Sequence, residues 1–188
     1  MTYAGFWRRA LSLVVDTAVL APFLAFHLTV GYSSRIALAI SAILIGVVSA
    51  AFPVFFLSRW GQTPGKMLAR IKVTHVDGSP IGTGQAWRRS MVDIGLSAAC
   101  MVGTLYALAT WRSGEWSSLD RSALLKALED GNPLSRPYEV GSQIWYWGEL
   151  AVLLTNQKRR ALHDFIAGTV VIRLPMPHPA SDARQLGR

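Results

Sequence analysis

Charged residues are scarce in this chain. Asp, Glu, Lys and Arg make up 16% of its 188 residues, whereas hydrophobic residues make up 51%. A soluble globular protein ordinarily has about 25% charged residues. The composition therefore excludes an ordinary soluble globule and predicts an integral membrane protein. A secretory signal has an apolar core of only about 7–15 residues. The N-terminal apolar run here is longer, so we expect it to be retained.

Cysteine is nearly absent as well. The single cysteine, Cys100, lies in an apolar run, which excludes an intramolecular disulfide and any cysteine cluster. The four histidines are dispersed, so the sequence predicts neither a metal site nor a cofactor. The sequence also lacks a recognisable pair of nucleophile and base, since the adjacency of His163 and Asp164 does not establish a dyad. We therefore expect no enzymatic activity.

Two further classes of partner are disfavoured. The segment from Gly61 through Pro64 and Gly65 to Lys66 and Met67 has its glycines too close together for a phosphate loop and lacks the Ser/Thr that binds magnesium. We interpret it as a turn at the membrane surface, with Lys66 at the headgroups. The net charge of +8 comes from residues that flank apolar runs instead of forming one basic face. This pattern indicates a bilayer with anionic headgroups as partner, not nucleic acid.

Long apolar runs are what the chain has in abundance. The run 36–57 carries no charge over 22 residues, enough to cross about 30 Å of hydrocarbon. The runs 10–31 and 91–110 are also predicted to span the bilayer. The run 141–156 begins with Trp145-Tyr146-Trp147 and is either a short fourth span or a re-entrant or surface segment. The fold class is thus an all-α membrane protein with a bundle of about four transmembrane helices.

The basic residues favour one orientation of these spans. Two precede the first run, six lie between the second and third, and six follow the fourth, which makes fourteen of nineteen. By the positive-inside rule, this asymmetry places both termini in the cytoplasm of a multi-pass plasma-membrane protein. Five basic residues fall outside in this arrangement: Arg35, Arg112, Arg121, Lys126 and Arg136.

The connecting segments carry weaker signals. Residues 72–76 followed by Asp77-Gly78 predict a strand and a turn, with a return strand from Ile81, and thus a small cytoplasmic β-hairpin between the second and third spans. Residues 118–128 of the outer loop have the apolar spacing of a short amphipathic helix. We expect a membrane domain over 1–174 and a disordered cytoplasmic tail over 175–188.

Charges inside the apolar runs mark candidate functional residues. Asp16 follows Arg9 by seven residues, so two helical turns place both on one face. Acids also occur in the third and fourth runs, at Asp93 and Glu149. A charge at membrane depth is costly, so such an acid has a partner or belongs to an ion path. Trp87-Arg88-Arg89 repeats the Trp-Arg-Arg sequence that ends at Arg9. The repetition indicates either a parallel internal repeat or two separate occurrences of the tryptophan and arginine that are typical of a membrane–water interface.

The segment 158–172 combines basic residues, His163-Asp164 and a β-branched end typical of a strand. His163 is a candidate proton shuttle and Asp164 a candidate cation ligand. The alternative is that Asp164 pairs with a neighbour such as Arg160 and only fixes the segment.

Four further motifs follow one another along the chain: Gly5-Phe-Trp-Arg-Arg9 with Asp16, the segment 61–66 leading to 71–73 and 77–80, the segment 160–164, and the segment 167–171. In this order they resemble the RDD family of small membrane proteins. The resemblance covers residues 2–173. It implies a family arginine at Arg9, a first aspartate at Asp16, and a second aspartate at Asp164 or, alternatively, Asp93. It also implies transport of an unidentified ligand.

Two functions follow as hypotheses. In the first, Asp16, with Asp93, Glu149, Asp164 or His163, forms a site that exchanges small cations for protons, because desolvated carboxylates bind hard cations and protons alike. Four spans are few for a carrier, so a homo-oligomer or a membrane-protein partner is expected. In the second, the chain is an assembly, anchoring or regulatory module, with the acids held by structural charge partners such as Arg9, Arg89 and Arg160.

Overall fold

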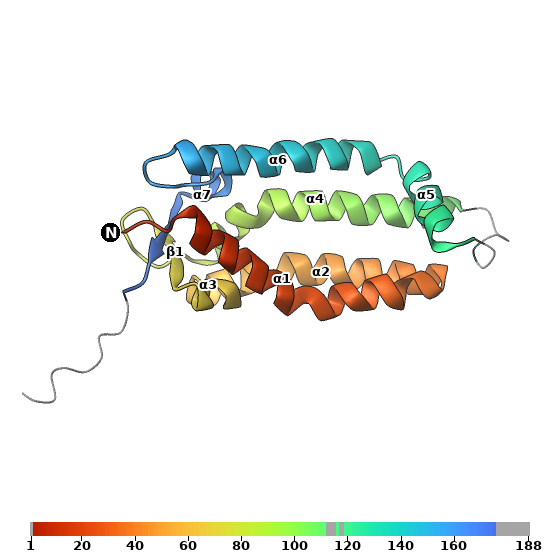
Figure 1. Cartoon of the computed structure of the whole chain (residues 1–188), viewed down its shortest axis with the longest axis horizontal. Helices are drawn as coiled ribbons and strands as arrows, with labels where there is room; N and C mark the ends of the chain where they lie inside the picture. The colour runs from red at the N-terminus through yellow and green to blue at the C-terminus, as the bar shows by residue number, and fades with distance from the viewer. Residues whose placement is uncertain (1, 112–115, 117–118, 176–188) are drawn as a thin grey trace, which may run out of the picture.

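Four long helices lie side by side along the molecule in the computed structural model, which describes residues 2–111, 116 and 119–175 (Figure 1). They are α1 (Phe6–Thr29), α2 (Arg35–Trp60), α4 (Thr83–Thr110) and α6 (Ser135–Thr155). The predicted mostly helical fold is confirmed. Among the described residues, three helices are long and apolar enough to cross a membrane, namely α1 with the short turn η1 (Gly31–Ser33), α2 and α4.

Local sequence explains where these helices begin and end. The Ser34 hydroxyl accepts a hydrogen bond from the Ala37 amide and caps α2. Gly61 ends α2 with a positive φ of 68°, a conformation that glycine adopts without a Cβ clash. Thr63 then caps the short helix α3 (Pro64–Leu68), and Pro64 occupies its first turn, where no amide donor is needed. The predicted surface turn is therefore a helix end followed immediately by a new helix start.

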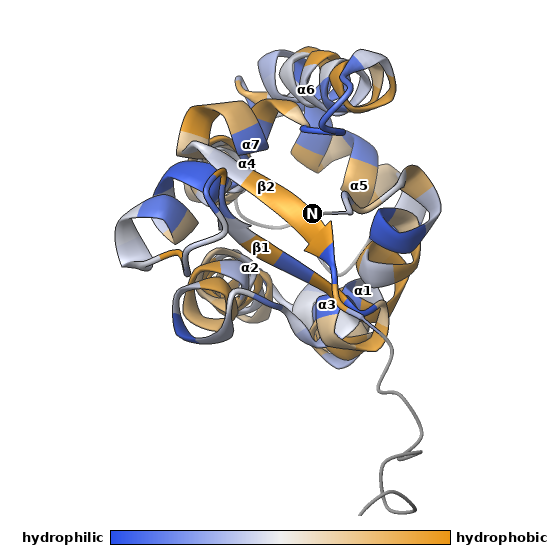
Figure 2. Cartoon of the chain, turned by 90° about the vertical axis from the view of Figure 1, so that its left-hand side faces the viewer, coloured by the Kyte–Doolittle hydropathy of each residue, from blue (hydrophilic) through white to orange (hydrophobic). Residues whose placement is uncertain are grey.

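The predicted strand exists, but its partner is not the one expected. Strand β1 (Ile71–His75) pairs antiparallel with β2 (Thr169–Arg173), nearly one hundred residues later, and the two cross one end of the bundle (Figure 2). The expected return strand from Ile81 is reduced to one bridge between Thr74 and Pro80. Proline lacks the amide needed for a ladder, whereas the β-branched residues of β2 pack into the core. The hairpin prediction was wrong in its pairing.

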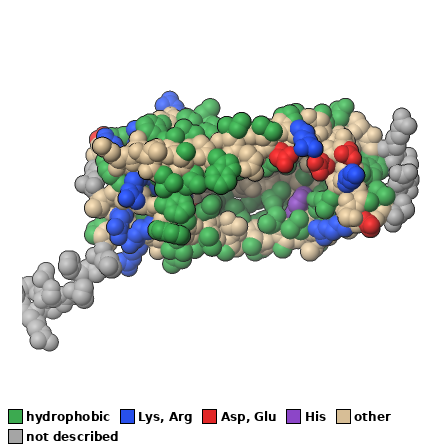
Figure 3. Space-filling model, turned by 45° about the horizontal axis from the view of Figure 1, so that its top comes forward, with side chains coloured by type: hydrophobic (Ala, Val, Ile, Leu, Met, Phe, Trp, Pro, Cys, Tyr) green, Lys and Arg blue, Asp and Glu red, His purple; other side chains and the backbone are tan. Residues whose placement is uncertain are grey.

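Buried apolar residues gather at the two ends of the bundle. The cluster at the sheet end consists of Ala4, Leu57, Ala69, Ile71, Val73, Ile81, Ala86 and Val171. The cluster at the opposite end consists of Leu38, Ala107, Leu108, Leu124 and Leu128. Between the ends the long helices present large apolar side chains outward, and Figure 3 shows this surface as mainly hydrophobic. An apolar exterior of this size is typical of a protein that contacts lipid.

The outer loop contains the amphipathic helix that its sequence predicts. Helix α5 (Arg121–Asp130) begins at Asp120, whose carboxylate accepts a hydrogen bond from the Ala123 amide at 2.8 Å. Leu124 and Leu128 are buried against the bundle, so this helix packs on protein. The predicted disordered tail falls, except for Pro175, outside the described residues.

Candidate functional site

Asp164 is the centre of a buried ionic cluster at the sheet end of the bundle. It lies in the short helix α7 (Leu162–Ala167), and its side chain is completely buried. Arg9 of α1 donates to Oδ2 at 2.8 Å, and Arg89 of α4 pairs with Oδ1. The amide of Ala161 donates to Oδ2 at 3.0 Å. Burial alone raises the pKa of Asp164, but Arg89, His163 and Arg9 together hold it well below its ordinary value.

Arg160 and Arg9 also fix the main chain around Asp164. The Arg160 guanidinium donates to the main-chain oxygens of Thr169 at 3.1 Å and Asp164 at 3.0 Å. Arg9 donates at 2.6 Å to the carbonyl of Arg159, which has a positive φ of 49°. Thus Arg9, Arg89 and Arg160, predicted as structural charge partners, all bond to the segment 159–169.

His163 links this cluster to Glu149 of α6. Burial and the neighbouring Arg89 lower the pKa of His163, so its imidazole is neutral at pH 7. Arg89 donates to Nε2 at 2.6 Å, and because a guanidinium only donates, Nε2 is the acceptor. The proton therefore sits on Nδ1, which is hydrogen-bonded to Glu149. The geometry fixes one tautomer and connects Glu149 to Asp164 through Arg89.

Asp16 belongs to a second, separate cluster. Its Oδ2 accepts a hydrogen bond from the Thr63 hydroxyl at 2.6 Å, and its Oδ1 accepts one from the Gly65 amide at 2.7 Å. Lys66 Nζ lies 3.9 Å from Oδ2, which is at the outer limit of an ion pair. The structure therefore attaches Asp16 to α3, whereas its predicted helical neighbour Arg9 pairs with Asp164.

Lys66, which the sequence predicts as a headgroup anchor, lies beside Asp16. Its side chain is only 18% exposed, and burial, together with Arg89, lowers its pKa to about 8, although Asp16 acts in the opposite direction. The ammonium thus loses its proton more than two pH units below the ordinary value for lysine. A lysine that is half protonated at about pH 8 is better suited to exchanging its proton than an ordinary lysine is.

One cavity of about 490 Å³ joins the two clusters. Its ionisable wall residues are Arg9, Asp16, Lys66, Arg89, Glu149 and His163, and its apolar wall includes Leu13, Leu150 and Leu153. Helices α1 and α6 supply most of this wall. Of the predicted acids, Asp16 and Glu149 line the cavity. Asp93 is not among the lining residues, and instead accepts a hydrogen bond from Trp145 Nε1 at 3.0 Å.

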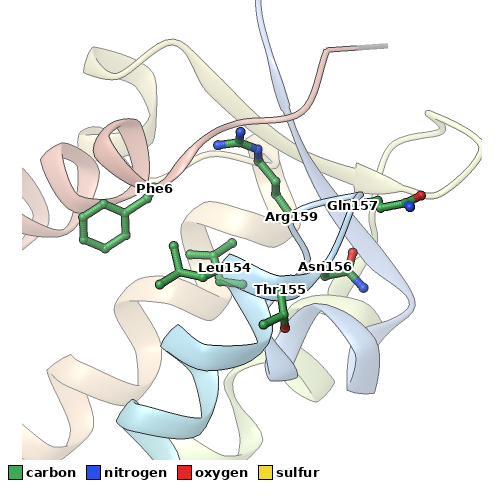
Figure 4. Close-up of a pocket in the computed structure, with 7 residues that line it drawn as sticks. Phe6, Leu154, Thr155, Asn156, Gln157 and Arg159 are labelled. Carbon is green, nitrogen blue, oxygen red and sulfur yellow. The ribbon is translucent and has the colours of Figure 1, made fainter.

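A smaller pocket of about 300 Å³ lies beside the end of α6. Figure 4 shows Phe6 on one side of it, with Leu154 and Arg159 nearby and polar residues 155–157 at the end of α6 and in the loop that follows. Arg159 is the one titratable residue of its wall, so this pocket offers less chemistry than the cavity. In the described part of the chain, no group of three His, Cys, Asp or Glu residues is arranged to hold a metal ion.

Sequence reasoning missed several residues of the site. Thr63 binds Asp16, and the Thr169 hydroxyl contacts both Arg89 and Asp164. Threonine is a preferred N-cap residue and proline a preferred first helical residue, so the sequence could have identified Thr63 as the cap of a helix that starts at Pro64. No local signal identifies Thr169, because its partners are distant in sequence.

Apolar helices around a buried ionic cluster define an integral membrane protein. The sequence model of the RDD family matches residues 3–168, and the chain belongs to that family, as its motifs predict. Searches of curated proteins and of solved structures return no match.

The contact between α1 and α3 leads to a stability prediction. A Cβ on Gly65 would overlap the Ser12 carbonyl and come within 2.9 Å of the Asp16 carboxylate. We expect Gly65→Ala to destabilise the protein by about 1–3 kcal/mol, the usual cost of overpacking. Thermal unfolding of detergent-purified protein measures this. Gly84→Ala is the control, since its Cβ would have no neighbour within 4 Å. Equal melting temperatures for the two variants would refute the close contact.

Proposed function

We propose that this RDD protein exchanges monovalent cations for protons at the Asp16–Lys66 pair. The observation that carries the proposal is a carboxylate, 14% exposed, that lies 3.9 Å from a lysine whose pKa is lowered to about 8. A cation that binds Asp16 replaces the lysine charge there. Lys66 then releases its proton, so one positive charge enters the site and one leaves. Carboxylate and hydroxyl oxygens, here from Asp16 and Thr63, are suitable ligands for a hard cation.

The proposed topology has four spans with both termini in the cytoplasm of the plasma membrane. Helix α6 has 21 residues and is about 31 Å long, enough to reach across the hydrocarbon. Lys and Arg side chains gather at the sheet end, beside the start of the C-terminal trace (Figure 3). The positive-inside rule assigns that end to the cytoplasm. The cavity then lies in the cytoplasmic half of the bilayer.

His163 and Glu149 supply a second proton-exchanging group on the same wall. The Nδ1–H of the neutral imidazole donates a hydrogen bond to Glu149, whose carboxylate lines the same cavity and is the group of this pair that can take up a proton. Because four spans are few for a carrier, we propose that the active form is an oligomer.

The Asp164 cluster favours the second function, an assembly or regulatory module. Arg9 and Arg89 both pair with the buried Asp164 and so hold α1, α4 and α7 together, as expected for a structural element. In this alternative the sheet end binds a partner protein, and the cavity carries no flux.

A pH-gradient dequenching assay distinguishes the two. Purified protein is reconstituted in liposomes with an imposed pH gradient, and Na⁺, K⁺ or Li⁺ is added outside. We expect cation-dependent dissipation of the gradient. Protein that is inserted and folded yet moves no protons with any of the three ions would exclude exchange and favour the module.

A further inference from the structure

A second cavity, of about 680 Å³, lies at the sheet end outside the proposed exchange site. Three arginines line it, each from a different segment: Arg8 from α1, Arg70 from the turn before β1, and Arg173 from the end of β2. The remaining lining residues are uncharged: Thr2, Ile172, Leu174 and Pro175. The wall thus contains basic side chains and no carboxylate.

Hydrogen bonds to main-chain carbonyls hold the three arginines near one another. The Arg8 guanidinium donates to the Ala69 carbonyl at 2.8 Å, which fixes α1 beside the turn that contains Arg70. The amide of Leu174 donates to the Arg70 carbonyl at 2.9 Å, and the amide of Arg173 donates to Thr2 at 2.8 Å. Arg70 has a positive φ of 53°, which is uncommon for a residue with a side chain. These hydrogen bonds therefore fix the main chain around the cavity.

Within the described ranges 2–111, 116 and 119–175, no acidic side chain pairs with the arginines of this cavity. Arg70 and Arg173 are exposed. Guanidinium groups bind phosphate oxygens with two parallel hydrogen bonds, so three of them around one cavity favour a phosphate group.

Exposed apolar side chains adjoin the basic residues in the chain. Trp7, next to Arg8, is 81% exposed, and Leu68, two residues before Arg70, is 66% exposed. Tryptophan beside arginine is typical of the membrane interface, where the ring lies at headgroup level. Apolar side chains contribute nothing to the binding of a soluble phosphate, whereas a phospholipid has both a phosphate and acyl chains.

We propose that this cavity binds the headgroup phosphate of an anionic phospholipid, with the acyl chains against the apolar surface beside Trp7 and Leu68. The inference goes beyond cation exchange and does not depend on it. A lipid at this place bridges α1, the α3–β1 turn and β2, the segments that position Asp16 and Asp164.

The test measures melting temperature in detergent micelles to which phosphatidylglycerol, phosphatidylcholine or inorganic phosphate is added. We expect phosphatidylglycerol to stabilise the wild type more than the other two. The variant Arg70→Gln/Arg173→Gln should lose this selectivity, with an apparent affinity for phosphatidylglycerol weaker by about tenfold or more. The matched control is Arg88→Gln/Arg136→Gln, which removes two exposed arginines outside the cavity.

The other outcomes of this experiment decide whether the ligand is a lipid and whether the site is this cavity. Equal stabilisation by inorganic phosphate would overturn the lipid assignment in favour of a soluble anion. Full selectivity in the Arg70/Arg173 variant, or equal loss in the control, would overturn the site. If the variant does not fold, native mass spectrometry of the wild type decides, because a headgroup site retains phosphatidylglycerol selectively at low salt and releases it at high salt. Exchange activity is measured separately, in phosphatidylcholine liposomes.

Discussion

Replacement of Asp164 by asparagine is expected to destabilise the protein by about 3–5 kcal/mol, the usual cost of removing one partner of a buried ion pair. The change keeps the shape of the side chain but leaves Arg9 and Arg89 buried beside each other without a counter-charge. Their side chains are only 13% and 7% exposed, so water does not compensate. For a chain of this length, the melting temperature should fall by roughly 10 °C.

Thermal unfolding of detergent-purified protein, with recovery by size exclusion, measures the loss. The matched control is Glu139→Gln, since Glu139 is 61% exposed and pairs with the exposed Arg136. Glu139→Gln should melt close to the wild type, because exposed ion pairs contribute little. If Asp164→Asn also melts like the wild type, the cluster does not stabilise the fold as described.

The pH dependence of this stabilisation follows from the lowered pKa of Asp164. A carboxyl group whose folded pKa is below its unfolded value stabilises the fold fully above the unfolded pKa, about 3.9. The contribution is lost only as the pH falls further toward the folded pKa. The cluster should therefore remain intact throughout the range in which exchange is measured.

Replacement of Asp16 by asparagine is expected to abolish cation-dependent proton movement while leaving the protein folded. Asparagine retains an oxygen that accepts from the Gly65 amide and an amide that donates to the Thr63 hydroxyl. It lacks the negative charge that a cation requires. The rate in proteoliposomes should fall by about tenfold or more, a barrier increase of at least roughly 1.4 kcal/mol.

The control for this variant is Asp77→Asn, the same chemical change at an exposed turn. Asp77 accepts hydrogen bonds from Ser79 and lines neither cavity. It should leave the rate unchanged. A folded Asp16→Asn protein with wild-type flux would show that Asp16 is not on the ion path. That result would favour the assembly or regulatory module.

Much of the fold was predictable because its signals are local. Apolar runs predicted the positions of the long helices, and the amphipathic spacing after Ser118 predicted α5. The pairing of β1 was not predictable from its own segment, because an aspartate-glycine turn predicts a hairpin whether or not a better strand exists elsewhere. Val170 and Val171, both buried, are better partners than the sequence after Pro80.

In the candidate site, too, the sequence identified important residues but not the residues with which they pair. The charges in the apolar runs and the His163-Asp164 pair predicted candidate residues, of which Asp16, Glu149 and His163 line the cavity. Helical spacing placed Arg9 and Asp16 on one face, but a long arginine side chain reaches past its own helix, and Arg9 pairs with a residue 155 positions away. The burial of Lys66 is likewise a tertiary property, since in the sequence it follows a turn and looks exposed.

The most direct test of exchange is a pH titration of proton release when Na⁺ is added to purified protein in weakly buffered solution. If the cation displaces the Lys66 proton, the wild type releases about one proton per protein at pH 7 at saturating Na⁺. The release declines through pH 8, where Lys66 is already losing its proton. Lys66→Gln should release none. No proton release from the wild type at pH 7, or equal release from Lys66→Gln, would contradict the account.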